Sequence, residues 1–247
     1  MQLSNYEMKK NGMFILHKTD FDDIATMVLR EYMPYVLSSP QPLNVELLAK
    51  EAFFLDVSYA RLSPMGEVLG LIAFANTDFC PYGAKADEYM ELQEGQILLD
   101  DSLVDGRVYG RRRFTLAHEL SHWICHRSYH SPDNRRYEFR RGVVACRTEN
   151  IEQNRRKQQE RTDAYWEEWQ ADNLAAALLM PKDMFVEVCR DTFGKYGVFK
   201  GYLRKGVDDP HVAHEIIQEI ANKFAVSFRA AQIHMKEFGF VNDRAIV

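Results

Sequence analysis

Residues 113–126 have the sequence RFTLAHELSHWICH, which contains an HExxH motif at positions 118–122. Histidines four residues apart project from the same face of a helix, one turn from each other. The imidazoles of His118 and His122 can therefore both reach one Zn²⁺ ion. Glu119 lies beside them, where its carboxylate can take a proton from a water on the metal. The motif predicts a helix that carries a zinc site.

The apolar residues around the motif indicate a helix with two chemically different sides. They cluster on the side opposite to His118 and His122, and they are Leu116, Ala117, Leu120, Trp123 and Ile124. One side of the helix is expected to face the core, while the other presents nitrogen ligands. We interpret the motif as a catalytic zinc site; the alternative is a pair of histidines with a purely structural role.

A catalytic zinc site takes a third protein ligand and leaves one position open for water. His126 lies on the same face of the helix, but about 12 Å of helix rise separates it from His118. While the helix stays regular, His126 is not expected to join both ligands on one ion, and we place it beside the site. His130, in the segment that follows, is a weaker candidate.

Two neighbouring glutamates on a later predicted helix are better candidates for the third ligand. Helical phase places Glu167 and Glu168 on opposite shoulders of an apolar stripe, so periodicity does not separate them. The alternative for either residue is an exposed carboxylate in the first turn, where the helix dipole favours negative charge. The residues alone leave both assignments open.

Composition narrows the class of protein. The 247 residues are 46% hydrophobic and 27% charged, as in soluble globular proteins. The longest apolar runs, residues 68–75 and 174–181, are shorter than the roughly 20 residues of a membrane span. The first residues have no apolar stretch long enough for a secretory signal. A net charge of −5 argues against a dedicated nucleic-acid binder.

Four cysteines without a CxxC pair are expected to be free thiols in a reducing cytoplasm; they are Cys80, Cys125, Cys146 and Cys189. Cys125 stands next to His126, which raises the question of redox sensing. A buried, inert thiol is the interpretation we favour there.

Local signals predict a mixture of helices and strands. Capping residues, helical spacing and proline or glycine stops predict helices over residues 20–32, 44–53, 111–126, 163–180, 210–224 and 227–239. Apolar runs between glycine turns predict strands over residues 57–62, 68–74 and 96–99. We expect an α+β fold, with a small mixed sheet beside the HExxH helix.

The segment 127–162 follows no helical or strand period. It holds ten Lys or Arg residues against five Asp or Glu residues. We interpret it as a solvated, mobile, basic insert; the alternative is a rim beside the active site that meets an acidic partner. The predicted organisation is an N-terminal helical segment (1–40), a core that includes the insert (41–190) and a C-terminal helical subdomain (191–247).

Two longer motifs follow one another in the chain. Residues 111–123 have the pattern R-x-R-F-T-L-A-H-E-L-x-H-W, and residues 168–181 have E-x-Q-A-D-x-L-A-A-x-L-L-M-P. With the strand region 66–74 and the helix–turn–helix-like segment 221–227, they resemble the ImmA/IrrE family of zinc metallopeptidases. The resemblance covers roughly residues 40–240. The basic insert is longer than the family pattern, which leaves the substrate open but not the metal site.

The resemblance implies a zincin-like, gluzincin-type core with one zinc ion per chain. In the family the first Glu of E-x-x-A-[ND] is the third zinc ligand, which is Glu168 here. Asp172 stands where the family carries Asn or Asp, and a role in orienting a metal ligand by a hydrogen bond is expected. The C-terminal subdomain is expected to be helical and helix–turn–helix-like.

The resemblance further implies a bacterial, cytoplasmic metallo-endopeptidase that cleaves a helix–turn–helix transcriptional repressor and so derepresses mobile-element or stress genes. Glu119 is the expected general base, because it can pass a proton from water to the leaving amine. An additional oxyanion donor is expected, with His126 or Tyr129 as candidates.

Two alternatives differ in chemistry from this interpretation. The chain is either an antitoxin-like protein that binds a repressor without cutting it, or a gluzincin that acts on generic peptides. Direct DNA binding is not expected, because the last predicted helix offers only Arg229 and Lys236 as cations. Catalysis requires Glu119, whereas binding does not.

Overall fold

The computed structural model describes residues 3, 5–85, 88–131, 143–147, 162–204 and 206–242. It has a mixed α+β fold, as expected, and divides into two compact units. The first comprises Met1–Ile24 with Asn44–Ala175, and the second comprises Ala25–Leu43 with Ala176–Val247. This division into two compact units does not test the three-part organisation predicted from the sequence, which stays a prediction.

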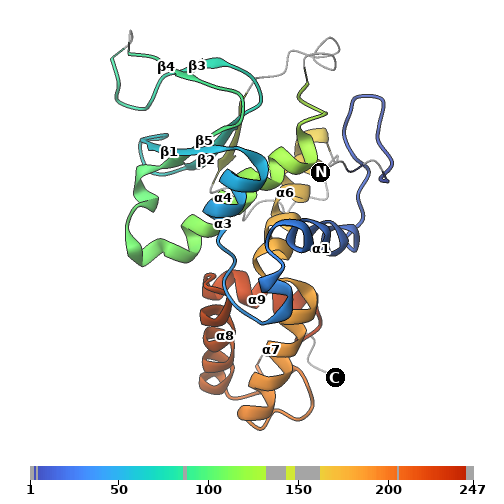
Figure 1. Cartoon of the computed structure of the whole chain (residues 1–247). Helices are drawn as coiled ribbons and strands as arrows, with labels where there is room; N and C mark the ends of the chain where they lie inside the picture. Colours follow the sequence, from blue (N-terminus) through green and yellow to red (C-terminus); the bar gives the residue numbers. More distant parts are fainter. Residues whose placement is uncertain are drawn as a thin grey trace. The chain divides into compact units, whose positions relative to one another are not determined.

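A four-stranded mixed sheet forms the centre of the first unit (Figure 1). Its strands, in spatial order, are β1 (Asp56–Ala60), β5 (Gln96–Asp100), β2 (Val68–Ala73) and β6 (Val143–Arg147). β1 runs parallel to β5, and β2 runs antiparallel to both β5 and β6. The two central strands β2 and β5 are almost wholly buried, which explains their continuous apolar runs. A separate antiparallel pair joins β3 (Thr77–Phe79) and β4 (Met90–Leu92).

The predicted strands over 57–62, 68–74 and 96–99 correspond to β1, β2 and β5. β6 lies inside the stretch that we predicted to be an unstructured insert, so that prediction was wrong for residues 143–147. Residues 132–142 and 148–161, which make up most of the insert, lie outside the described residues. Their solvated, mobile character stays a prediction.

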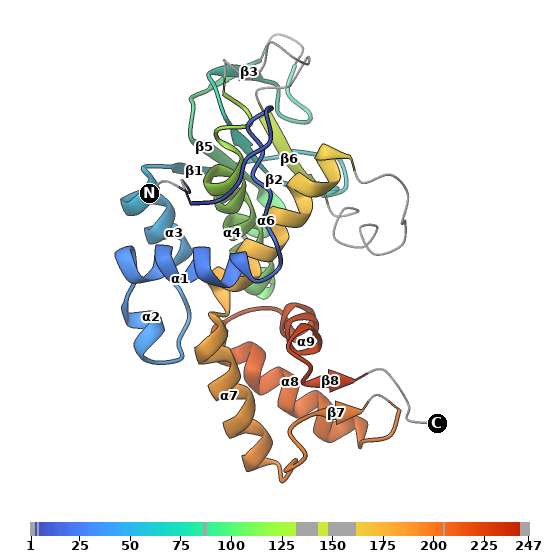
Figure 2. The same cartoon turned by 90° about the vertical axis from the view of Figure 1, so that its right-hand side faces the viewer.

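The helix α4 (Tyr109–His126) packs against β2 and β5 and carries the HExxH motif. Two short 3₁₀ helices, η2 (Asp101–Leu103) and η3 (Gly106–Val108), lead into it from the end of β5. The helix α6 (Asp163–Leu179) runs beside α4 (Figure 2), and the hydrogen bond from His118 to Asp172 joins the two. α4 therefore has the sheet on one side and α6 on another.

The segment predicted as one helix over 44–53 is shorter and irregular. It begins as α3 (Val45–Leu47), with the Asn44 side chain accepting a hydrogen bond from the backbone of Leu47 at 3.0 Å. It continues as the π-helical segment η1 (Leu48–Ala52) and ends before Phe54, whose φ of 55° lies in the left-handed region. The helix α1 (Asp20–Tyr32) begins with three aspartates in its first turn, where the helix dipole favours them.

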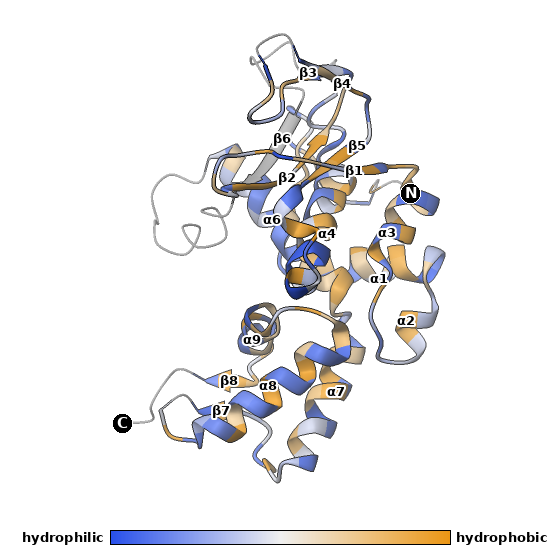
Figure 3. Cartoon of the chain, turned by 90° about the vertical axis from the view of Figure 1, so that its left-hand side faces the viewer, coloured by the Kyte–Doolittle hydropathy of each residue, from blue (hydrophilic) through white to orange (hydrophobic). Residues whose placement is uncertain are grey.

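The second unit is helical. Its described elements are α2 (Tyr35–Ser38), α7 (Lys182–Lys195), α8 (Pro210–Phe224) and α9 (Phe228–Glu237), with the two-residue strands β7 (Leu203–Arg204) and β8 (Val241–Asn242). In Figure 3, α8 shows alternating polar and apolar stripes, which agrees with its buried Ile216, Ile220 and Phe224. No described helix is long and apolar enough to cross a membrane.

The sequence did not predict α7. Pro181 ends α6, and it also stands at the N-cap of α7, where its missing N–H costs nothing. The last two helices begin as predicted. The Asp209 side chain accepts from the backbone of His211 at 2.8 Å, and Ser227 accepts from that of Ala230 at 3.1 Å.

Replacing Ser227 by alanine removes the N-cap acceptor of α9. We expect Ser227→Ala to lower the free energy of unfolding of the second unit by about 1 kcal/mol. Ser227→Asp keeps an acceptor at the same place and is expected to preserve stability. Urea unfolding followed by circular dichroism measures both variants. Equal losses in the alanine and aspartate variants would show that the cap does not stabilise this unit.

Candidate metal centre

Three side chains from α4 and α6 bring their ligand atoms together. The Nε2 atoms of His118 and His122 lie 2.9 Å apart. The two carboxylate oxygens of Glu168 lie 3.5 Å from Nε2 of His118 and 3.6 Å from Nε2 of His122. Ligand atoms at tetrahedral zinc, each about 2.0–2.1 Å from the ion, are about 3.3 Å apart. The measured separations bracket that value, so this donor set fits one zinc ion.

The two neighbouring glutamates belong to different groups of side chains. Glu168 is near the ligand nitrogens of His118 and His122, whereas the Glu167 carboxylate makes a close contact with Nε2 of His130. Glu167 also lies near His122 and His126, in a second cluster that is wholly buried. Helical phase did not separate the two glutamates, whereas the structure places them in two adjacent clusters: Glu168 with His118 and His122, and Glu167 with His122 and His126.

Asp172 lies behind the first ligand histidine. Its Oδ1 atom is 2.9 Å from Nδ1 of His118, on the side of the ring away from Glu168. A carboxylate in this position accepts a hydrogen bond from Nδ1–H, which keeps the proton on that nitrogen and leaves the Nε2 lone pair for a metal. The structure thus brings Asp172 to the place where a hydrogen bond orients the ring of His118.

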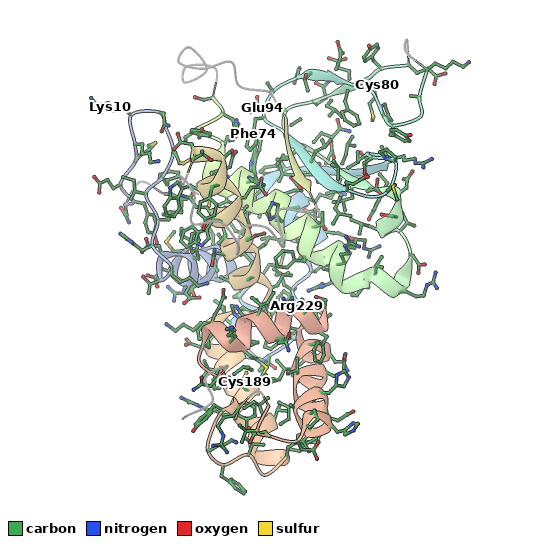
Figure 4. The ribbon with its side chains drawn as sticks, turned by 180° about the vertical axis from the view of Figure 1, so that it is seen from behind. Lys10, Phe74, Cys80, Glu94, Cys189 and Arg229 are labelled. Carbon is green, nitrogen blue, oxygen red and sulfur yellow. The ribbon has the colours of Figure 1, made fainter. Side chains whose placement is uncertain are left out.

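His126 is fully buried and contacts two polar groups. Its Nδ1 atom lies 3.0 Å from Nδ1 of His122, and its Nε2 atom lies 3.1 Å from Oε1 of Gln170. Tyr129 is buried too, with its ring edge-on to His130. His130 stacks on Phe74, at the end of β2, with ring centroids 4.4 Å apart (Figure 4 labels Phe74). Of the two oxyanion candidates, His126 therefore belongs to the second cluster, and Tyr129 contacts His130, the partner of Glu167.

Glu119 is fully buried on the side of α4 that faces β2. A Cβ atom placed on Gly70 would lie 2.7 Å from Oε1 of Glu119 and 2.8 Å from Cγ2 of Thr115. Only a glycine leaves room for the carboxylate against the strand. Sequence reasoning missed this role of Gly70, although a glycine inside an apolar strand often marks such a close approach.

Burial determines the protonation of His122 and His126. Desolvation lowers the pKa of His122 well below its usual value, and the neighbouring His118, His126 and His130 lower it further. Desolvation also lowers the pKa of His126 to about 4, although the charge of Glu167 acts in the opposite direction. Both rings are therefore neutral near pH 7, and neutral imidazole is the form that binds a metal.

Comparison with known families identifies the family to which the chain belongs. A family model for the IrrE N-terminal-like domain, peptidase family M78, matches residues 106–236, more than half of the chain. The chain belongs to this family. The match includes α4, α6 and the two motifs quoted above, and it makes the chain a metallopeptidase of the ImmA/IrrE type. No curated protein matches the chain. β1 to β5 and the N-terminal segment lie outside the matched residues of this M78 peptidase.

A methyl group on Gly70 tests the packing of Glu119 against β2. We expect Gly70→Ala to lower the free energy of unfolding by about 1–3 kcal/mol, since the added Cβ meets a buried carboxylate and a threonine methyl. Gly106→Ala is the matched control, because a Cβ atom added at Gly106 would have nothing within 4 Å and the φ of this residue is ordinary. Thermal and urea unfolding compare the two, and equal stability of both variants would contradict the close approach.

Three of the cysteines, Cys80, Cys125 and Cys189, are expected to differ sharply in reactivity. Burial raises the pKa of the Cys125 thiol and of the Cys189 thiol to about 12, whereas Cys80 is exposed (Figure 4). Because the thiolate is the reactive form, iodoacetamide near neutral pH should alkylate Cys80 and spare the other two until the protein is unfolded. Peptide mass mapping measures this. Alkylation of Cys125 in the folded protein as fast as that of Cys80 would contradict an inert thiol.

Proposed function

We propose that this M78 peptidase is a cytoplasmic, zinc-dependent endopeptidase that holds one zinc ion per chain with His118, His122 and Glu168. The observation that carries the proposal is the convergence of these three ligand atoms within 2.9–3.6 Å, next to the buried Glu119. A gluzincin-type core, with two ligands from an HExxH helix and one from a later helix, agrees with this arrangement.

Zinc bound at such a site supplies a Lewis acid that polarises a carbonyl and lowers the pKa of water. Glu119 takes the proton from the attacking water and delivers it to the leaving amine nitrogen. Asp172 accepts a hydrogen bond from Nδ1–H of His118 and holds that ring with Nε2 toward the site. The backbone of β2 at Gly70 limits the movement of the Glu119 carboxylate. Of our two candidates for an additional oxyanion donor we retain Tyr129 and not His126, because both ring nitrogens of His126 face other side chains, His122 and Gln170.

We propose a helix–turn–helix transcriptional repressor as the substrate, so that cleavage derepresses mobile-element or stress genes. Family membership supports a protein substrate. We also interpret α8 and α9 as a helix–turn–helix-like pair. They are joined by a three-residue turn in which Ala225 has a φ of 52°, and Ser227 caps the second helix. This pair either packs as a structural subdomain or docks the repressor.

A non-catalytic, repressor-binding protein on the same scaffold is the second candidate. Its ligand set would be a structural one, and Glu119 would have no role in binding. A contact between α9 and DNA is not proposed, because Arg229 and Lys236 are the only lysine or arginine residues in that helix.

The decisive measurement combines metal content with hydrolysis. We expect about one zinc ion per chain in the wild type and in Glu119→Gln, and a clear loss in Glu168→Ala, because a catalytic site needs three protein ligands. Hydrolysis is measured by mass spectrometry on purified helix–turn–helix repressor domains and on a generic peptide library. Only the wild type is expected to cut, since Glu119→Gln keeps the metal but cannot accept the proton.

Glu167→Ala is the matched control for the ligand assignment, because it removes a carboxylate one residue away on the same helix. Loss of zinc in this variant and not in Glu168→Ala would exchange the two assignments. Zinc-loaded wild type that binds a repressor but never cuts it, with the same binding by Glu119→Gln, would favour the non-catalytic candidate. Turnover of generic peptides with no repressor cleavage would favour a peptide-degrading gluzincin.

A further inference from the structure

A continuous set of buried hydrogen bonds connects the second ligand histidine to the backbone of the N-terminal segment. It passes from His122 to His126 over 3.0 Å and from His126 to Gln170 over 3.1 Å. The side-chain amide of Gln170 then donates to the carbonyl oxygen of Phe14 at 2.8 Å. The three side chains are at most 2% exposed, so the set is shielded from water.

The proton positions along this set follow from which nitrogen faces the metal, and this step rests on the proposed function. Nε2 of His122 is the atom near Glu168, so the single proton of the neutral ring is on Nδ1 and is donated to His126. His126 then accepts with Nδ1 and donates with Nε2 to Oε1 of Gln170. The oxygen of the Gln170 amide faces His126 because the amide nitrogen donates to the Phe14 carbonyl, which can only accept. The opposite direction would put a proton on the metal-facing nitrogen.

We propose that His126 and Gln170 are positioning residues, which lock His122 in the tautomer and ring orientation that zinc binding needs. They do so without contact to substrate or metal. Asp172 orients the ring of His118 through one hydrogen bond. For His122, three successive hydrogen bonds between uncharged groups do the same, and the last of them ends on a main-chain carbonyl.

The Phe14 carbonyl oxygen, at which this set of hydrogen bonds ends, is itself held in place. Phe14 belongs to a small hairpin, here called the N-terminal hairpin (residues 7–15), in which it pairs with Met8 and Gly12 turns with a φ of 86°. The hairpin runs along α6 (Figure 2), where Lys9 and Asn11 each donate to Asp163 at 2.8 Å. The Phe14 carbonyl is therefore held against the helix that carries Glu168. The N-terminal hairpin thereby becomes part of the support of the metal centre, although it lies outside the matched family residues.

The same residues permit a different interpretation, which the test below distinguishes. His122, His126 and Glu167 have ligand atoms within 4.8 Å of one another, which is compatible with a second cation. Such a cation would take the Nδ1 atom of His122, and that nitrogen would have to lose its proton. Positioning predicts one zinc ion per chain, whereas a second cation site predicts two.

The first measurement uses the zinc-loaded wild type. Long-range proton–nitrogen NMR correlation spectra of protein with isotope-labelled histidine report which ring nitrogens carry protons. We expect a proton on Nδ1 of His122 and on Nε2 of His126. A proton on Nδ1 of His126, or none on either nitrogen that faces the other ring, would overturn the proposal without any variant having to fold.

The second measurement compares variants of His126 by competition with a zinc chelator. His126→Leu cannot accept the proton of His122, and we expect zinc to bind 10–100-fold more weakly. His126→Asn is the matched control, because its amide oxygen takes about the place of Nδ1 and still accepts; we expect affinity within about threefold of wild type. Gln170→Leu leaves the Nε2 proton of His126 without this acceptor and should weaken zinc binding as well.

The outcomes separate this proposal from the proposed function. Wild-type affinity in folded His126→Leu overturns the positioning role, and so does an equal loss in the leucine and asparagine variants. Two metal ions in the wild type, one of them lost in His126→Leu, overturn it in favour of a second cation site. A wild type that binds no zinc overturns the proposed function itself. Normal zinc binding that does not depend on His126 overturns only the positioning role.

Discussion

The pairing of α4 with α6 depends on buried and half-buried polar side chains between them. His118 meets Asp172, His126 meets Gln170, and Glu168 approaches both ligand histidines. Burying a polar group without a partner costs free energy, so each of these side chains constrains the helix opposite to it. An apolar interface would tolerate small rotations of one helix on the other. This interface does not, because a rotation would break several hydrogen bonds together.

The opposite side of α4 is fixed by the sheet. Glu119 follows His118 directly, and a step of about 100° along a helix turns its side chain away from α6 toward β2. There Gly70 leaves space for the Glu119 carboxylate, which a Cβ atom at that position would meet at 2.7 Å. The depth of the helix in the unit is thus set from two sides: by hydrogen bonds on α6 and by close packing on β2. The proposed base and the proposed ligands keep their relative places because both constraints act on the same helical turn.

Features that depend on neighbours in the sequence could be predicted. HExxH and its apolar phase indicated a helix, and Asn44, Asp209 and Ser227 cap helices as expected because capping joins residues two or three positions apart. Features that depend on distant residues could not. Residues 143–147 form β6 through pairing with β2, and only that partner makes them a strand.

The same distinction holds within the candidate site. The helical periodicity of α6 could not separate Glu167 from Glu168, because the two glutamates differ in the histidines of α4 that their carboxylates approach. Gln170 stands in the second quoted motif, but the sequence did not indicate its role, since that role comes from His126, forty-four positions earlier, and from the carbonyl of Phe14. A main-chain oxygen is available at every residue, so no pattern of side chains marks the one that is used.

The two ligand histidines are oriented by partners of different charge, and burial explains the difference. Asp172, whose side chain is 28% exposed, retains some hydration for its charge, and a carboxylate behind His118 is tolerated there. His122 and His126 are fully buried, in a region that already contains Glu119 and Glu168. A further carboxylate behind His122 would add desolvated negative charge where no water reaches it. A neutral imidazole and a neutral amide orient the ring without that cost, because they pass the hydrogen bond on to a main-chain carbonyl. The one other carboxylate nearby among the described residues, Glu167, is in contact with His130, so its charge has a partner of its own.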